Sequence, residues 1–159
     1  MLKEYFEIKK QILGLKEFRS SDIAVGLFAD KFKKISYEEA IKDIRESYKV
    51  FGHDYVSMFD EAVNNGWIDA YPRENKKSGG YTISTYGEHP YILLNFDGTM
   101  DWASAITHEF GHAMHSYYSA KNQPYSKYEY TLFVAEVVSL TNEILYNNYL
   151  LEKTSDKEM

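Results

Sequence analysis

Thr107-His108-Glu109-Phe110-Gly111-His112 is the stretch of this sequence that decides its fold and its chemistry. Because His112 follows His108 by four positions, the two imidazoles lie on the same face of an α-helix. Two imidazoles placed in this way can bind one tetrahedral Zn²⁺ and leave two positions for a third ligand and for water. Glu109 is rotated by about 100° from His108 around the helix axis. Its carboxylate would therefore stand beside the metal, where it can take a proton from zinc-bound water.

The sequence around the motif favours this interpretation. A chance His-Glu-x-x-His is expected in well under ~1 in 100 chains of this length. Upstream, Thr99 can act as an N-cap, and Asp101 falls in the first helical turn, where the helix dipole favours an anion. The motif is therefore expected in the middle of a helix over residues 99–120. The plain alternative is a helix whose histidines only make ordinary hydrogen bonds.

The third metal ligand is expected on the next helix, predicted over residues 130–152. Two packed antiparallel helices would bring Glu136 opposite the two histidines. The residues that flank Glu136 are apolar, and a carboxylate buried among them would have to be paired or metal-bound. The same helix is expected to pack on the core through an apolar stripe, namely Phe133, Val137, Leu140, Ile144 and Leu145.

Three other polar residues near the motif have open roles. Glu143 lies two helical turns after Glu136, and Ser139 lies three residues after it, so either could orient a ligand imidazole. The alternative for Glu143 is a plain surface acid. His115 competes with Glu136 as third ligand, but three ligands on one straight helix strain tetrahedral geometry. We therefore expect His115 beside the metal ligands or lining the cleft.

Upstream of the motif the sequence predicts a pair of helices and a small sheet. The run from Ser36 to Glu39 has the pattern of a capping box, and helices are expected within residues 36–66. Strands are expected at 81–86 and 91–96, which are rich in β-branched and aromatic residues, and they place a small sheet within 78–97. The predicted fold class is mainly α with a small β-sheet (α+β), in one domain over residues 1–159.

Composition narrows the classes of function. The 159 residues carry a formal net charge of −6, which argues against a nucleic-acid binder, because such a protein needs a basic stripe. The chain has no cysteine, so a tight transition-metal site must use histidine and carboxylate ligands. No run of 18 apolar residues occurs and the N-terminal sequence is too acidic for a signal peptide. We therefore expect a cytoplasmic location and no membrane partner.

At these residues the sequence resembles the oligoendopeptidase F and thimet oligopeptidase group of zinc metallopeptidases. The resemblance is carried by His108–Tyr118, Asn122–Tyr125, Phe133–Ser139 with Thr141–Glu143, and upstream by Ser78–Tyr81 and Tyr86–Tyr91. It implies a zincin-like catalytic core of the oligopeptidase type with a deep channel for short, unfolded peptides. It also implies one Zn²⁺ held by His108, His112 and Glu136, with Glu109 as general base.

The resemblance further implies where a peptide binds. Substrate backbone would pair as an added strand with the edge of the small sheet. Gly79, Gly80, Tyr81 and His89 are the candidate contacts. Bare backbone at the two glycines would allow close approach of a substrate, and the alternative for them is a simple flexible loop.

Members of that group are several times longer than this chain, so the sequence is expected to be a partial catalytic domain without the later oxyanion donors. One hypothesis is a zinc metalloendopeptidase that hydrolyses internal bonds of short oligopeptides through water activated by Glu109. The other is a catalytically incompetent zinc- or peptide-binding fragment. A structural zinc site is a third idea, but it would normally close all four positions with protein ligands. Uncovered apolar faces would also favour self-association.

Overall fold

The structure, a computed structural model, describes residues 2–26 and 34–153, and the chain divides into two compact units, Met1–Phe32 and Lys33–Met159. The first unit holds helix α1 (Leu2–Ile12) and the short 3₁₀ helix η1 (Ser20–Ala24). Lys9 Nζ donates to the carbonyl of Ile23 at 2.7 Å, and the ring of Phe6 stacks on that of Phe18. The sequence predicts a single domain over residues 1–159, and this remains a prediction although the chain divides into two compact units.

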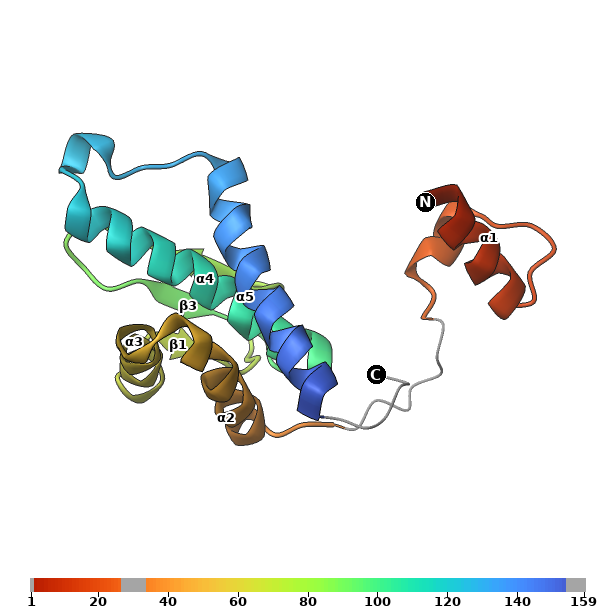
Figure 1. Ribbon diagram of the computed structural model, residues 1–159, viewed down its shortest axis with the longest axis horizontal. Helices are drawn as coiled ribbons and strands as arrows, with labels where there is room; N and C mark the ends of the chain where they lie inside the picture. The colour runs from red at the N-terminus through yellow and green to blue at the C-terminus, as the bar shows by residue number, and fades with distance from the viewer. Residues whose placement is uncertain (1, 27–33, 154–159) are drawn as a thin grey trace. The chain divides into compact units, whose positions relative to one another are not determined.

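The second unit holds the remaining elements of the chain (Figure 1). They are, in order, α2 (Tyr37–Ser47), η2 (Tyr48–Phe51), α3 (His53–Asn64), β1 (Ile68–Asp69), β2 (Tyr81–Ile83), β3 (Tyr91–Leu93), α4 (Met100–Asn122), η3 (Tyr125–Lys127) and α5 (Leu132–Lys153). The predicted fold class, mainly α with a small sheet, is confirmed. Within residues 2–26 and 34–153, none of the helices has the length and apolar character of a membrane span.

Local hydrogen bonds start the helices where the sequence predicts. Ser36 and Glu39 form the capping box at the start of α2, each side chain accepting from the backbone N–H of the other at 3.1 Å. Thr99 caps α4 by accepting from the backbone N–H of Trp102 at 3.4 Å. This second cap defines where the motif helix begins.

The sheet has the strand order β1-β3-β2. β1 pairs with β3 in parallel, with Ile68 opposite Ile92, and β2 pairs with β3 antiparallel, with Thr82 opposite Ile92. The two predicted strands are shorter than expected, and β1 was not predicted. In this order β2 is an edge strand, and α4 packs against both β2 and β3.

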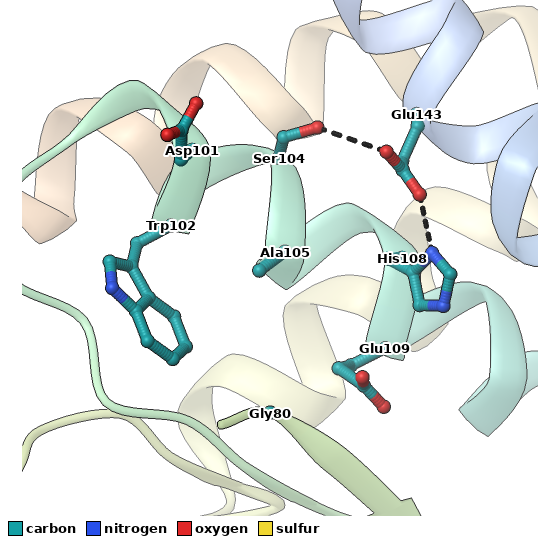
Figure 2. Close-up of a pocket in the computed structure, with 8 residues that line it drawn as sticks. All are labelled: Gly80, Asp101, Trp102, Ser104, Ala105, His108, Glu109 and Glu143. Carbon is teal, nitrogen blue, oxygen red and sulfur yellow. Dashed lines mark hydrogen bonds and ion pairs between the residues drawn. The ribbon is translucent and has the colours of Figure 1, made fainter. Parts of the chain in front are cut away.

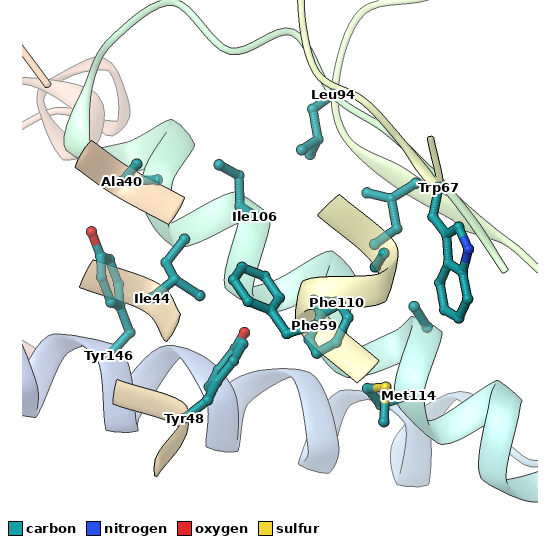
Figure 3. Close-up of a cluster of buried hydrophobic side chains, with 14 of the residues drawn as sticks. Ala40, Ile44, Tyr48, Phe59, Trp67, Leu94, Ile106, Phe110, Met114 and Tyr146 are labelled. Atoms are coloured by element: carbon teal, nitrogen blue, oxygen red, sulfur yellow. The ribbon is translucent and has the colours of Figure 1, made fainter. Parts of the chain in front are cut away.

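An aromatic cluster forms the centre of the core (Figure 3). Phe110, the residue after Glu109 in the motif, is fully buried against Tyr48 and Phe59, with ring centroids 5.5 and 4.9 Å away. Fully buried Ile106 and Ala113 lie on the same side of α4. One side of the motif helix is thus anchored in the core, which leaves the side with the histidines for other contacts.

The predicted packing of α5 is wrong. The stripe expected to face the core is mostly exposed: Phe133, Val137, Leu140 and Ile144 are all exposed. The buried side of α5 instead consists of small and polar residues and one tyrosine, namely Ala135, Ser139, Asn142 and Tyr146. The reason lies at Gly111, where an added Cβ would meet Ser139 Cα at 2.7 Å. Backbones that approach so closely leave no room for large apolar side chains between them.

Candidate metal centre

Three side chains from α4 and α5 converge on one point: His108, His112 and Glu136 each offer one ligand atom, and these atoms lie within 4.8 Å of one another. Nε2 of His108 and Nε2 of His112 are 3.1 Å apart. Oε2 of Glu136 lies 3.5 Å from the first of these nitrogens and 3.9 Å from the second. The two consecutive helices thus bring together the three residues predicted as metal ligands.

The spacing of these donors fits a tetrahedral zinc ion. Bonds of about 2.0–2.1 Å at tetrahedral angles place ligand atoms about 3.3–3.4 Å apart. The observed separations of 3.1, 3.5 and 3.9 Å bracket that value. Three protein ligands would also leave a fourth position open, as in catalytic rather than structural zinc sites.

Glu143 determines which nitrogen of the His108 ring carries the proton (Figure 2). Its Oε1 contacts Nδ1 of His108, and its Oε2 accepts from Ser104 Oγ at 3.4 Å. A carboxylate beside Nδ1 holds the proton of a neutral imidazole on that nitrogen, which leaves Nε2 as a lone pair directed at the shared point. The contact with His108 argues against the alternative that Glu143 is a plain surface acid.

Ser139 contacts the third candidate ligand. It is fully buried, and its hydroxyl lies 3.2 Å from Oε2 of Glu136 and 3.1 Å from the backbone carbonyl of the same residue. A donor at this distance restricts the orientation of the Glu136 carboxylate.

The burial expected for Glu136 is wrong. Its side chain is 40% exposed, and its neighbour Phe133 is 80% exposed. Because α5 turns its small and polar side towards α4, the large apolar residues Phe133, Val134 and Val137 near Glu136 are exposed. Glu136 therefore stands at the border of the helix pair, with its carboxylate turned to the histidines.

Electrostatics favour neutral histidine at the centre. Burial lowers the pKa of His112 below its ordinary value, and the neighbouring His108 lowers it further, against the smaller opposing influence of the surrounding carboxylates. A neutral imidazole is the form that binds a metal ion. His112 is thus held in the state that a ligand needs.

Glu109, the predicted base, is nearly buried, with 8% of its surface exposed. Thr82 of β2 contacts Glu109. The hydroxyl oxygen of Thr82 is 2.7 Å from Oε2 and 2.9 Å from the backbone carbonyl oxygen of Glu109. Thr82 is not among the residues predicted from the sequence. Its place next to Glu109 follows from the packing of β2 on α4, which no local pattern encodes.

His115 lies outside the three-donor cluster. Its ring stacks on that of Tyr130 with centroids 3.7 Å apart, and burial followed by the proximity of His112 lowers its pKa. Nδ1 of His115 is buried and has no hydrogen-bond partner among the residues that the structure describes. The geometry therefore favours Glu136 over His115 as the third donor.

A pocket of about 400 Å³ opens beside the cluster (Figure 2). It is lined by Gly80, Asp101, Trp102, Ser104, Ala105, His108, Glu109 and Glu143. Of the four predicted peptide contacts, only Gly80 is in this lining. Tyr81 pairs with Leu93 in the sheet, and the Gly79 carbonyl accepts from Asn95 Nδ2 at 2.8 Å. His89 stacks on Trp67 instead.

The whole chain, residues 1–159, matches the model of peptidase family M3. It is 38% identical over 158 residues to oligopeptidase PepF of Bacillus subtilis, an alignment that covers 99% of this chain and 24% of that protein. It is 34% identical to the chromosomal oligoendopeptidase F of Lactococcus lactis subsp. cremoris, over 99% of this chain and 26% of that one. The chain thus spans about a quarter of the length of these relatives.

Solved structures share the fold of this chain. A crystal structure of a Chlamydophila abortus protein assigned as a peptidase matches with a TM-score of 0.83 and 39% identity, over 99% of this chain and 26% of that one. A structure of PZ peptidase A with an inhibitor matches with a TM-score of 0.77 over 92% of this chain and 26% of that one. At 23% identity, this second match supports the fold alone.

Proposed function

This chain belongs to peptidase family M3, and from that premise we propose that it carries the zinc site of a metalloendopeptidase that cleaves internal bonds of short oligopeptides. The observation that supports the proposal best is the convergence of His108, His112 and Glu136 at separations that suit one zinc ion, next to the carboxylate of Glu109. The names of the relatives, which are oligopeptidases and oligoendopeptidases, support short peptides as the substrate class.

In this proposal each residue has a defined task. His108, His112 and Glu136 hold the metal, Glu143 keeps His108 in the required tautomer, and Ser139 orients Glu136. Zinc held there would act as a Lewis acid towards the peptide carbonyl and would make water a stronger acid. Glu109 accepts the proton of the attacking water and delivers it to the leaving nitrogen.

The edge strand β2 would hold the substrate. Its partner on one side is β3, and among the described residues no strand pairs with its other side, where an extended peptide would add. Gly80 directly precedes this strand and lines the pocket, and its lack of a side chain would let a peptide approach Glu109. Contacts of a peptide with Gly79, Tyr81 and His89 stay predictions.

One observation favours the second candidate, a module that binds zinc and peptide without turnover. The described residues that line the pocket include three carboxylates but no tyrosine, lysine or arginine that could stabilise an oxyanion. Loss of one such donor costs about 10²–10³ in rate. The module hypothesis therefore predicts tight zinc binding and very slow cleavage.

A quenched fluorogenic peptide separates the two functions. For the endopeptidase we expect turnover by the zinc-loaded chain, its loss with a chelator and its return on adding zinc. Glu109→Gln should bind zinc like the wild type but leave the peptide intact, because an amide cannot accept the proton. Zinc binding by the wild type without turnover supports the module, and a wild-type chain that binds no zinc contradicts both functions.

We also propose that the chain self-associates through the exposed apolar side of α5. Large apolar residues on that side are exposed, among them Phe133, Val137 and Ile144. Exposed apolar surface of this kind marks contact sites. Sedimentation velocity should show a concentration-dependent dimer that the Phe133→Glu variant shifts towards monomer. A wild type that stays monomeric at high concentration would contradict the idea.

A further inference from the structure

The Glu109 carboxylate depends on Thr82 for its hydrogen bonding. A nearly buried carboxylate is costly unless donors replace the water that it has lost. Within the part of the chain that the structure describes, the hydrogen bond to this carboxylate comes from Thr82, at 2.7 Å. The hydroxyl of Thr82 on β2 thus donates to the carboxylate of Glu109, the predicted base, on α4.

The position of the Thr82 hydroxyl is fixed from two directions. Its strand pairs with β3, where Thr82 lies opposite the fully buried Ile92. Threonine is branched at Cβ, which restricts its side-chain rotation. The hydroxyl has one proton and two acceptors in reach, Oε2 and the backbone carbonyl of Glu109, and a charged acceptor makes the stronger bond.

Gly80 limits the carboxylate from the other direction. A Cβ at Gly80 would lie 3.5 Å from both Cγ and Oε1 of Glu109 and 3.1 Å from Leu94 Cδ2. A side chain at Gly80 would therefore press on Leu94 and be in van der Waals contact with the Glu109 carboxylate. With Oε2 bonded to Thr82, Oε1 is the oxygen of Glu109 that has no hydrogen bond among the described residues, and Glu109 lines the pocket.

We propose that Thr82 is a positioning residue that fixes Oε2 of Glu109 and leaves Oε1 free to accept the proton of the attacking water. The proposal rests on the proposed role of Glu109 as base. It assigns to β2 a second task besides holding the substrate, since the same strand would orient the base.

Two variants separate the hydroxyl of Thr82 from the shape of its side chain. Thr82→Val keeps the branched shape and the strand preference but removes the donor, whereas Thr82→Ser keeps the donor. We expect Thr82→Val to lower kcat by about 10–100-fold, which is the usual effect of losing a residue that orients a side chain of the site by a hydrogen bond. KM and zinc affinity should not change, because neither the ligands nor the strand edge is altered. Thr82→Ser should restore most of kcat.

Crystal structures of the zinc-loaded variants give a second readout that needs no turnover. The Glu109 carboxylate should keep its place in Thr82→Ser and leave it in Thr82→Val, with Thr82→Ala as the replacement if the valine variant does not fold. An unmoved carboxylate without the hydroxyl would overturn the proposal, as would equal losses in the serine and valine variants or a parallel loss of zinc affinity. If the wild type shows no turnover, the proposed function fails while the carboxylate position still decides the role of Thr82.

Discussion

Gly111→Ala should damage the candidate metal centre, although Gly111 itself offers no ligand atom. The new Cβ would stand 2.7 Å from Ser139 Cα, 3.0 Å from Asn142 Nδ2 and 3.1 Å from the backbone nitrogen of Ser139. Carbon atoms pack at about 3.5–4.0 Å. To relieve the contact α5 would therefore have to move by about 1 Å away from α4. Glu136 lies one turn from Ser139 and would move with the helix.

The effect on zinc should exceed the effect on stability. Overpacking costs about 1–3 kcal/mol, while alanine favours a helix over glycine by about 1 kcal/mol. The free energy of unfolding of the metal-free chain should therefore fall by only about 0–2 kcal/mol. Metal–ligand distances tolerate about 0.2 Å, so a displacement of about 1 Å takes Glu136 out of range. We expect a loss of zinc affinity of at least about tenfold, similar to that for loss of an orienting contact.

Competition with a chromogenic chelator measures the affinity, and urea unfolding of the same samples measures the stability. Gly111→Ser serves as a second variant for comparison. Serine has a larger side chain than alanine, so it should weaken zinc binding further. If Gly111→Ala binds zinc as tightly as the wild type, the close approach of the helices does not set the geometry of the metal centre and the reasoning fails.

Three further changes test other parts of the structure. Glu143→Gln should lower zinc affinity by about 10–100-fold, since an amide holds the His108 tautomer less firmly, and chelator competition would show no change if the contact were incidental. Asn142→Leu removes a fully buried amide whose Nδ2 donates to Tyr55 at 2.8 Å, and urea unfolding should show a loss of about 1–3 kcal/mol, whereas an unchanged midpoint would contradict this. The lowered pKa of His112, due first to burial and then to His108, means that the unfolded chain binds protons more readily than the folded one. The metal-free chain should therefore lose stability as the pH falls through about 6.5, and His112→Gln should weaken that dependence in urea melts at pH 5 to 8, so an identical slope in both proteins would argue against it.

Features that depend on neighbouring residues could be predicted from the sequence. The caps at Ser36 and Thr99 involve residues within three positions, and the facing of His108 and His112 follows from helix geometry alone. The position of Glu136 near the histidines also follows from the sequence, although its side chain is 40% exposed and not buried. This part of the site could be predicted because its residues lie on two consecutive helices that a short loop joins.

Features that depend on how elements meet could not be predicted. β1 has only two residues and is held by pairing with β3, including a bond of 2.7 Å from Ile92 N to Trp67 O. The contact of Thr82 with Glu109 depends on the register of β2 and on its packing against α4. The apolar pattern of α5 predicts a stripe that faces the core, whereas the close approach at Gly111 places the small and polar side of the helix there instead.

Crystals of the zinc-loaded chain, measured at the zinc absorption edge, test the metal centre directly. We predict one anomalous peak at about 2.0–2.2 Å from Nε2 of His108, Nε2 of His112 and a carboxylate oxygen of Glu136. The fourth position should hold solvent. A map without a peak between these three side chains, or with His115 in the place of Glu136, would contradict the account.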